Sequence, residues 1–237
     1  MPTLVDVALT PGAIRAGSTF IVVDLLRATT TIAVLFSQGL GRLTVTETIE
    51  EARALARDRP SALLMGEEAG LPPAGFGLGN SPLEAAEISF EGGEAVMATT
   101  NGSRAICAAA ARGPTLTGAL ANRNAVCAAV APAPEITIVC SGNEAGAVMA
   151  LEDVCAAGAL VATLRSTDPT LDFTDGALLA EAVWHRSGPA LAATSAHARH
   201  LRSLGFAADI EYAIQPDTAP VTPAVVEHGR GWAVLET

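Results

Sequence analysis

Residues 20–30, FIVVDLLRATT, combine an apolar run, a polar turn and the start of a helix. The four apolar residues before Asp24 do not alternate with polar ones, which is typical of a strand that is buried on both faces. Arg27, Thr29 and Thr30 follow within one turn, and a helical pattern continues to about Gln38. The segment therefore predicts a buried strand that passes through a polar turn into a helix.

Other parts of the chain repeat this order of strand, polar turn and helix. The predicted strands are 43–46, 62–65, 95–100 and 136–140. One predicted helix spans 49–57, a second follows the turn Asn101–Arg104 and ends at about Arg112, and a third spans about 151–164. Strands that alternate with helices predict an α/β protein with a three-layer α/β/α arrangement and a mixed, largely parallel sheet.

The remaining segments have weaker patterns. Residues 66–82 are rich in Gly, Pro and Asn, and a loop of this length in a compact domain is usually functional or disordered. We expect helices at about 173–186, 194–204 and 206–213 and a final strand at 232–235. Because no fixed-period repeat or clear linker is found, we predict a single domain over residues 1–237.

Composition excludes several classes of protein. All 14 basic residues are Arg, so a Schiff-base lysine or a P-loop lysine is excluded. The net charge of −11 argues against binding to nucleic acid or to an anionic membrane surface. The four cysteines lie in apolar segments without CxxC spacing, and the N-terminus has no signal-peptide pattern, so we expect a cytoplasmic protein.

Polar side chains follow the predicted strands at their carboxyl ends, where α/β sheets bind ligands. Asp24 can hold a divalent cation there, Arg27 can bind phosphate oxygens, and Thr29 and Thr30 add hydroxyls at a helix start. The alternative is that Asp24 caps the helix while Arg27 extends to solvent. From this segment alone, the two interpretations are equally supported.

The run Thr99–Arg104 is the more specific signal, because hydroxyl and amide side chains, a glycine and an arginine share one strand-to-helix turn. A structural cap needs only one of these groups, so we favour an oxyanion site at the helix end. The candidate ligands of the anion here are Thr99, Thr100, Asn101, Gly102 and Arg104.

Two acidic pairs also follow predicted strands. The composition around Glu67-Glu68 favours a solvated acidic loop, and at most one of the two carboxylates is expected to face the ligand site. Glu152 and Asp153 begin a helix, where acids are common for dipole reasons. Together with Asp24 they can also complete the oxygen-rich site that Mg²⁺ prefers.

The four histidines lie outside these strand ends and lack the spacing of a zinc motif. His197 and His200 form a basic patch with Arg199 and Arg202 on one predicted helix. A surface or packing role is favoured for this patch, with contact to an anionic substrate as the alternative.

Five motifs in this order resemble the 2-phosphosulfolactate phosphatase family. They are Asp24–Thr30, Gly66-Glu67, Gly79–Pro82, Thr99–Gly102 and Leu151–Asp153. The stretch His200–Phe206, with Asp209 and Ile210, is also similar to the C-terminal region of that family. The resemblance implies a magnesium-dependent hydrolase on a layered α/β/α fold that converts 2-phosphosulfolactate to sulfolactate, a step in coenzyme M biosynthesis.

A concrete hypothesis for the mechanism gives each motif a role. Asp24, Arg27 and Glu67 are the expected catalytic residues, and the expected Mg²⁺ ligands are Asp24, Glu67, Glu152 and Asp153. Thr29, Thr30, Asn80, Ser81 and the Thr99–Arg104 turn would bind the substrate. Asp24 as a phosphoryl acceptor is less favoured, because haloacid-type phosphatases have a second Asp where this chain has Leu26.

We expect the protein to bind a small anionic phosphate ester and to bind neither nucleic acid nor a membrane. A homodimer is a possible assembly. Two rival interpretations remain at this level. One is a non-catalytic anion-binding or regulatory protein that keeps the pocket, and the other is a structural domain in which the polar turns are only helix caps.

Overall fold

The apolar run at residues 20–23 lies inside β2 (Thr19–Val23). The computed structural model describes residues 3–14, 17–131 and 133–237. Phe20 and Val22 of β2 pack into one hydrophobic core, and Ile21 and Val23 pack into another on the opposite face. This two-sided burial explains why the strand lacks polar alternation.

Ten strands in the described part of the chain form one sheet, in the order β4-β5-β3-β10-β9-β6-β2-β7-β1-β8. Besides β2 they are β1 (Leu4–Ala8), β3 (Arg42–Thr46), β4 (Leu63–Gly66), β5 (Glu94–Ala98), β6 (Thr115–Gly118), β7 (Glu135–Cys140), β8 (Asp172–Phe173), β9 (Ala224–Gly229) and β10 (Trp232–Glu236).

The C-terminal hairpin of β9 and β10 joins two parallel groups of strands. β3 pairs with β10 in antiparallel orientation, and β9 joins β6 through the antiparallel pair Leu116 and Ala224. The pairings of β1 with β7, of β2 with β6 and β7, and of β5 with β3 and β4 are all parallel. The predicted mixed, largely parallel sheet is confirmed.

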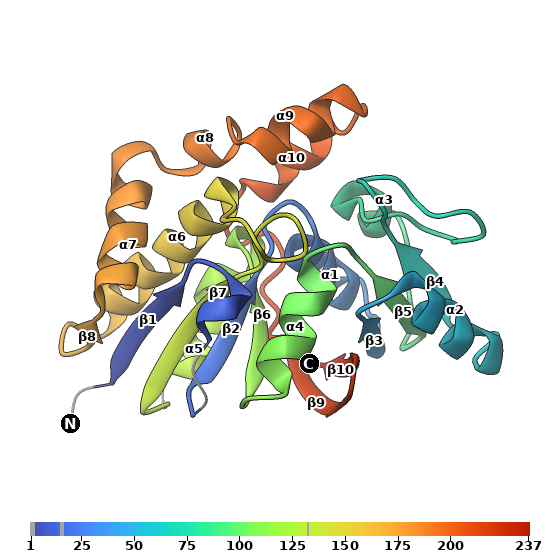
Figure 1. Cartoon of the computed structure of the whole chain (residues 1–237), viewed down its shortest axis with the longest axis horizontal. Coiled ribbons are helices and arrows are strands. Elements are labelled where there is room, and N and C mark those ends of the chain that lie inside the picture. The colour runs from blue at the N-terminus through green and yellow to red at the C-terminus, as the bar shows by residue number, and fades with distance from the viewer. Residues whose placement is uncertain (1–2, 15–16, 132) are drawn as a thin grey trace.

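Helices cover both faces of the sheet, as predicted for three layers (Figure 1). One core contains residues of α5 (Arg123–Val130), α6 (Leu151–Thr167) and α7 (Asp175–Ser187). The other core contains residues of α1 (Ala28–Ser37) and α4 (Gly102–Ala110). The remaining α-helices are α2 (Ile49–Asp58), α3 (Pro82–Ala86), α8 (Pro189–Ala192), α9 (Ala196–Ser203) and α10 (Ala207–Ala213), and the 3-10 turns are Pro11–Ala13 and Leu120–Asn122.

Helices α8, α9 and α10 run across the top of the molecule in Figure 1, above the loop that connects β7 to α6. In the parts of the chain that are described, none of the helices combines the length and the apolar character that a membrane span requires.

Sequence patterns did not predict β1, β6, β9 or α5. β1 is interrupted by Asp6, and β6 has only four residues. The side chains of β9 are half-buried or exposed. Short or exposed strands of this kind depend on pairing with neighbours in the sheet more than on their own composition.

Candidate active site

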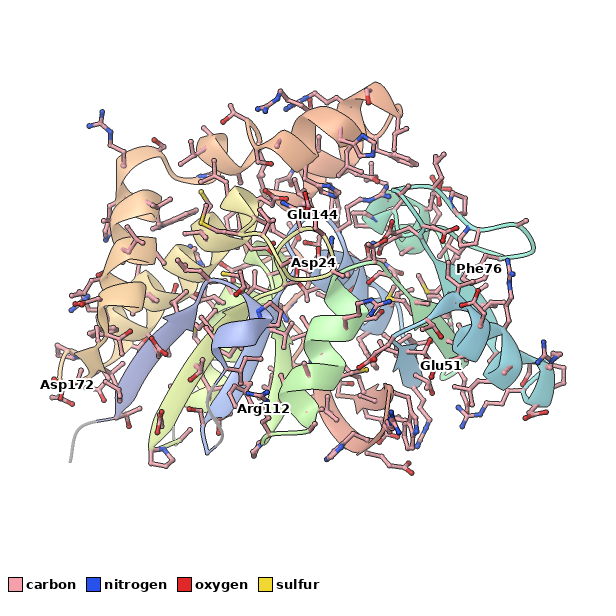
Figure 2. All side chains as sticks on the ribbon, in the orientation of Figure 1. Asp24, Glu51, Phe76, Arg112, Glu144 and Asp172 are labelled. Carbon is pink, nitrogen blue, oxygen red and sulfur yellow. The ribbon has the colours of Figure 1, made fainter. Side chains whose placement is uncertain are left out.

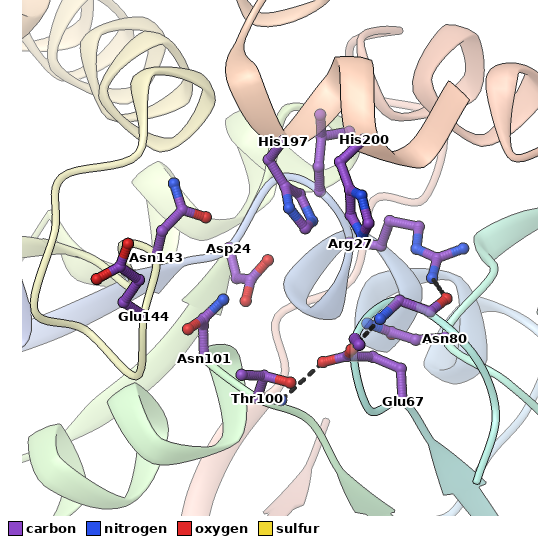
Figure 3. Close-up of a pocket in the computed structure, with 13 residues that line it drawn as sticks. Asp24, Arg27, Glu67, Asn80, Thr100, Asn101, Asn143, Glu144, His197 and His200 are labelled. Carbon is purple, nitrogen blue, oxygen red and sulfur yellow. Dashed lines mark hydrogen bonds between the residues drawn. The ribbon is translucent and has the colours of Figure 1, made fainter. Parts of the chain in front are cut away.

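A cavity of about 360 Å³ lies at the carboxyl ends of β2, β4, β5 and β7, below α9. Figure 2 shows Asp24 in the middle of the molecule, whereas Glu51 and Asp172 lie toward its periphery. The polar side chains that line the cavity are all labelled in Figure 3: Asp24, Arg27, Glu67, Asn80, Thr100, Asn101, Asn143, Glu144, His197 and His200.

Asp24 lies at the end of β2, with 7% of its surface exposed. Its Oδ1 accepts a hydrogen bond from the Ala28 amide at 3.3 Å, and its own amide donates to the Thr29 hydroxyl at 3.0 Å. Burial, together with the charges of Glu67 and Glu152, raises the pKa of Asp24 to about 7. The hydrogen bond from Ala28 therefore offsets only part of the cost of burying the negative charge of this carboxylate.

This raised pKa predicts how the stability of the metal-free protein depends on pH. The Asp24 pKa is 3.8 in a model peptide and about 7 in the folded protein, so the folded state binds the proton more tightly. Between these values the unfolded state holds fewer protons, and the free energy of unfolding therefore falls as pH rises. We expect a loss of a few kcal/mol between about pH 4 and pH 7.

Urea unfolding in EDTA at a series of pH values measures this loss. Asp24→Asn removes the titrating group, so the variant should show a clearly flatter dependence on pH than the wild type. Equal slopes for the two proteins would show that Asp24 is not responsible.

Arg27 is a buried cation that is fixed from three sides. Its Nη1 donates to Asp209 Oδ2 at 2.7 Å, and its Nη2 donates to the Gly70 carbonyl at 2.7 Å. The guanidinium lies over the Phe206 ring, 4.2 Å from the centroid. Ser81 donates to the other oxygen of Asp209 at 2.6 Å. These contacts leave Arg27 3% exposed, and they fix its orientation at the cavity.

The turn after β5 supplies the opposite wall. Thr99 is buried, and its amide and hydroxyl both bond to Ser103 within the turn. Thr100 and Asn101 line the cavity. The Asn101 Oδ1 accepts from the Ala145 amide at 3.0 Å, which ties this turn to the loop after β7.

Gly102, the first residue of α4, is required by close packing against Asp24. A Cβ atom at Gly102 would lie 2.7 Å from Asp24 Oδ2 and 2.5 Å from the Ala28 Cβ. The permissive glycine that the sequence pattern indicates is therefore needed for approach of the helix end to the carboxylate.

Gly102→Ala should consequently reduce both stability and turnover, because either Asp24 or the start of α4 must move. We expect destabilisation of about 1–3 kcal/mol, as for other overpacked sites, and at least a tenfold loss of kcat. The matched control is Gly12→Ala, where the nearest atom to a new Cβ is 3.9 Å away. Urea unfolding and steady-state kinetics of both variants test the prediction, and equal effects at the two positions would contradict it.

The other predicted metal ligands differ in their surroundings. Glu67 accepts the amides of Gly70 and Thr100, each at 2.7 Å, so its carboxylate braces two loops at the cavity wall. Asp153 accepts the Leu25 amide at 2.9 Å and the Gly142 amide at 3.0 Å. Both oxygens of each carboxylate thus accept hydrogen bonds from the protein, so these two residues also hold neighbouring loops in place, which the sequence pattern did not indicate.

Glu152 is different, because its Oε2 is buried without a hydrogen-bond partner among the described residues. It lies near enough to Asp24 to raise the pKa of that carboxyl. The Asn80 Oδ1, at the cavity wall, is also buried without a partner in the described part of the chain. Unsatisfied buried oxygens are costly, so each of the two needs a partner such as a water or a bound cation.

These oxygens suit a hard cation. Groups of three or more His, Cys, Asp or Glu side chains with metal-site geometry are not found among the described residues. Mg²⁺ commonly uses one or two carboxylates together with waters and substrate phosphate, so a site of Asp24 and Glu152 fits its chemistry.

Six of the nine predicted substrate ligands lie outside the cavity lining, namely Thr29, Thr30, Ser81, Thr99, Gly102 and Arg104. The Thr29 and Thr30 side chains are buried, and their hydroxyls donate to the carbonyls of Asp24 and Leu25. Ser81 bonds to Asp209 and caps α3. Arg104 is exposed and lines a neighbouring hollow with Glu47 and Glu50. These residues therefore shape or flank the site, a correction that follows from where their side chains point.

The structure also adds residues to the site. His197 and His200 line the cavity, which corrects the surface or packing role favoured from sequence. Burial lowers the pKa of His197, and the nearby His200 and Arg27 act in the same direction. Asn143 and Glu144 enter from the loop after β7. The spacing of three between the histidines was the available signal, since it puts them on one helix face.

A buried Asp at a strand end, a fixed Arg, and a helix start on the opposite wall define the class of an α/β enzyme that acts on a small anionic substrate. The profile of the 2-phosphosulpholactate phosphatase family matches residues 6–228. The chain belongs to this family and is a phosphoric monoester hydrolase.

Relatives of the chain carry the same description. A protein of Deinococcus radiodurans that is described as a probable 2-phosphosulfolactate phosphatase is 39% identical to this chain, and the match covers 87% of each chain. The corresponding protein of Thermotoga maritima is 34% identical, over 94% of this chain and 96% of the relative. That of Pseudothermotoga lettingae is 33% identical with the same coverage.

Proposed function

We propose that this protein is a magnesium-dependent phosphatase of 2-phosphosulfolactate, or of a related small phosphorylated hydroxy acid, which it converts to sulfolactate and phosphate. The observation that carries the proposal is one cavity lined by both the buried Asp24 carboxyl, with a pKa raised to about 7, and the fixed guanidinium of Arg27. The descriptions of the relatives support the choice of substrate. From the family resemblance we also propose that the reaction belongs to coenzyme M biosynthesis. Because the four cysteines are free and buried, we propose that the protein acts in the cytoplasm.

The residues divide into two groups in this proposal. Asp24 and Glu152 hold Mg²⁺, which when bound neutralises phosphate charge and lowers the pKa of water. Arg27 binds phosphate oxygens with N–H groups that Asp209 and Gly70 do not use, since its guanidinium has five donors. Thr100 and Asn101, the N-cap residue of α4, face the same space and stabilise negative charge on the transferred group.

Phosphate release from 2-phosphosulfolactate, measured with added Mg²⁺ and again with EDTA, tests the proposal. We expect turnover that EDTA abolishes and that Mg²⁺ restores. Mg²⁺ should also raise the melting temperature of the wild type by binding the folded state only. Turnover that is insensitive to EDTA would contradict the role of the metal, and binding of the ester without phosphate release would favour the non-catalytic alternative.

A further inference from the structure

Helix α9 presents two imidazoles to the cavity. The centroids of the His197 and His200 rings are 6.1 Å apart, and both side chains line the cavity. Figure 3 shows them pointing from α9 toward Asp24 and Arg27. The arginines of the same helix turn elsewhere, because Arg199 and Arg202 donate to the carbonyls of Thr194 and Ala193. The basic patch is thus divided, and only its histidines reach the site.

The charges of the cavity leave one place for a second anionic group. Among the described residues, Arg27 supplies the one guanidinium that lines the cavity, and Asp209 already neutralises its charge. Asp24, Glu67 and Glu144 add carboxylates to the lining. A second acid group of a substrate would be repelled along most of this wall. At α9 it would instead meet imidazoles, each of which has a ring N–H to donate even when neutral.

The two histidines are also separated from the turn after β5. In Figure 3, Thr100 and Asn101 lie on the opposite side of the cavity from α9, with Asp24 between them. The volume of about 360 Å³ lies in the range of sites for small ligands, so one molecule can extend from one wall to the other.

We propose that His197 and His200 form a subsite for the second acid group of the substrate, a carboxylate or sulfonate. This inference rests on the proposed function, in which Arg27 and the turn after β5 hold the phosphate. The subsite would select phosphate esters that carry a charged tail, and it would retain little affinity for inorganic phosphate alone.

Calorimetric titration of the Mg²⁺-loaded protein with two probes tests the subsite. The probes are sulfolactate, which carries the acid groups without phosphate, and inorganic phosphate. In the double variant His197→Asn/His200→Asn we expect the Kd of sulfolactate to rise about 10- to 100-fold, as for loss of hydrogen bonds to a charged group. The Kd of phosphate should stay within about twofold.

The matched control is His185→Asn, since His185 lies on α7 with a side chain that is 66% exposed. It should leave both affinities unchanged. Melting temperatures show whether each variant is folded. If the double variant does not fold, the single variants His197→Asn and His200→Asn are titrated in its place.

Parallel weakening of both probes, no weakening of sulfolactate, or failure of the wild type to bind sulfolactate would each overturn the subsite. Failure of the proposed function would give a different result, because the wild type would then release no phosphate in the turnover assay. The change in Kd between wild type and variant could still be measured for each of the two probes.

Discussion

Asp24→Asn is expected to abolish turnover while the protein stays folded. The substitution keeps the size of the side chain but removes the charge that we propose holds the metal beside the phosphate. Loss of several kcal/mol of transition-state stabilisation corresponds to a fall in kcat of about 10³-fold or more. Because the ionised carboxyl is disfavoured by burial, the neutral variant should melt at the same or a higher temperature above pH 7.

Steady-state phosphate release and thermal melting measure these two effects. Asp172→Asn is the control, since Asp172 is exposed on the edge strand β8, far from the cavity (Figure 2). Turnover at the wild-type rate by Asp24→Asn would refute the assignment. A phosphoenzyme trapped on Asp24 would change its role from metal ligand to nucleophile.

Asp209→Ala is expected to cause the largest loss of stability. The Arg27–Asp209 pair has an N–O distance of 2.7 Å and side chains that are 2% and 3% exposed. Removing Asp209 leaves the guanidinium buried without its counter-ion and removes the acceptor of the Ser81 hydroxyl. Breaking a buried pair from one side typically costs about 3–5 kcal/mol. Because Arg27 also loses its fixed orientation, kcat/KM should fall with stability.

Urea unfolding of Asp209→Ala and of Glu227→Ala provides the comparison. Glu227 pairs with Arg42 at 3.0 Å, but the side chains are 58% and 34% exposed. Exposed pairs of this kind contribute about 1 kcal/mol or less. A similar small loss for both variants would show that the buried pair does not anchor the site.

The motifs of the site were visible in the sequence because local chemistry produces them. The strand of residues 19–23, the turn at Asp24 and the helix start at Ala28 all depend on residues within a few positions of one another. The glycine at 102 and the cap at Ser81 were recognisable for the same reason. Short strands such as β6 were not, because sheet pairing stabilises them.

The role of each polar residue could not be predicted in the same way. Thr29 and Thr30 follow the motif closely, yet their hydroxyls bond to backbone carbonyls. Glu67 and Asp153 are acids at strand ends, yet they brace loops through backbone amides. A motif gives the residue type, whereas the direction of a side chain depends on which groups the fold brings near it.

The α/β class and the strand-to-helix turns follow from patterns within short segments of the chain, and they were therefore predictable without a structure. The pairing of Asp209 with Arg27, and the position of His197 and His200 at the cavity, could be seen only in the folded molecule. These contacts join residues that lie far apart along the chain. Asp209 and Arg27 are 182 positions apart, and only packing of the C-terminal helices across the strand ends brings the two charges together.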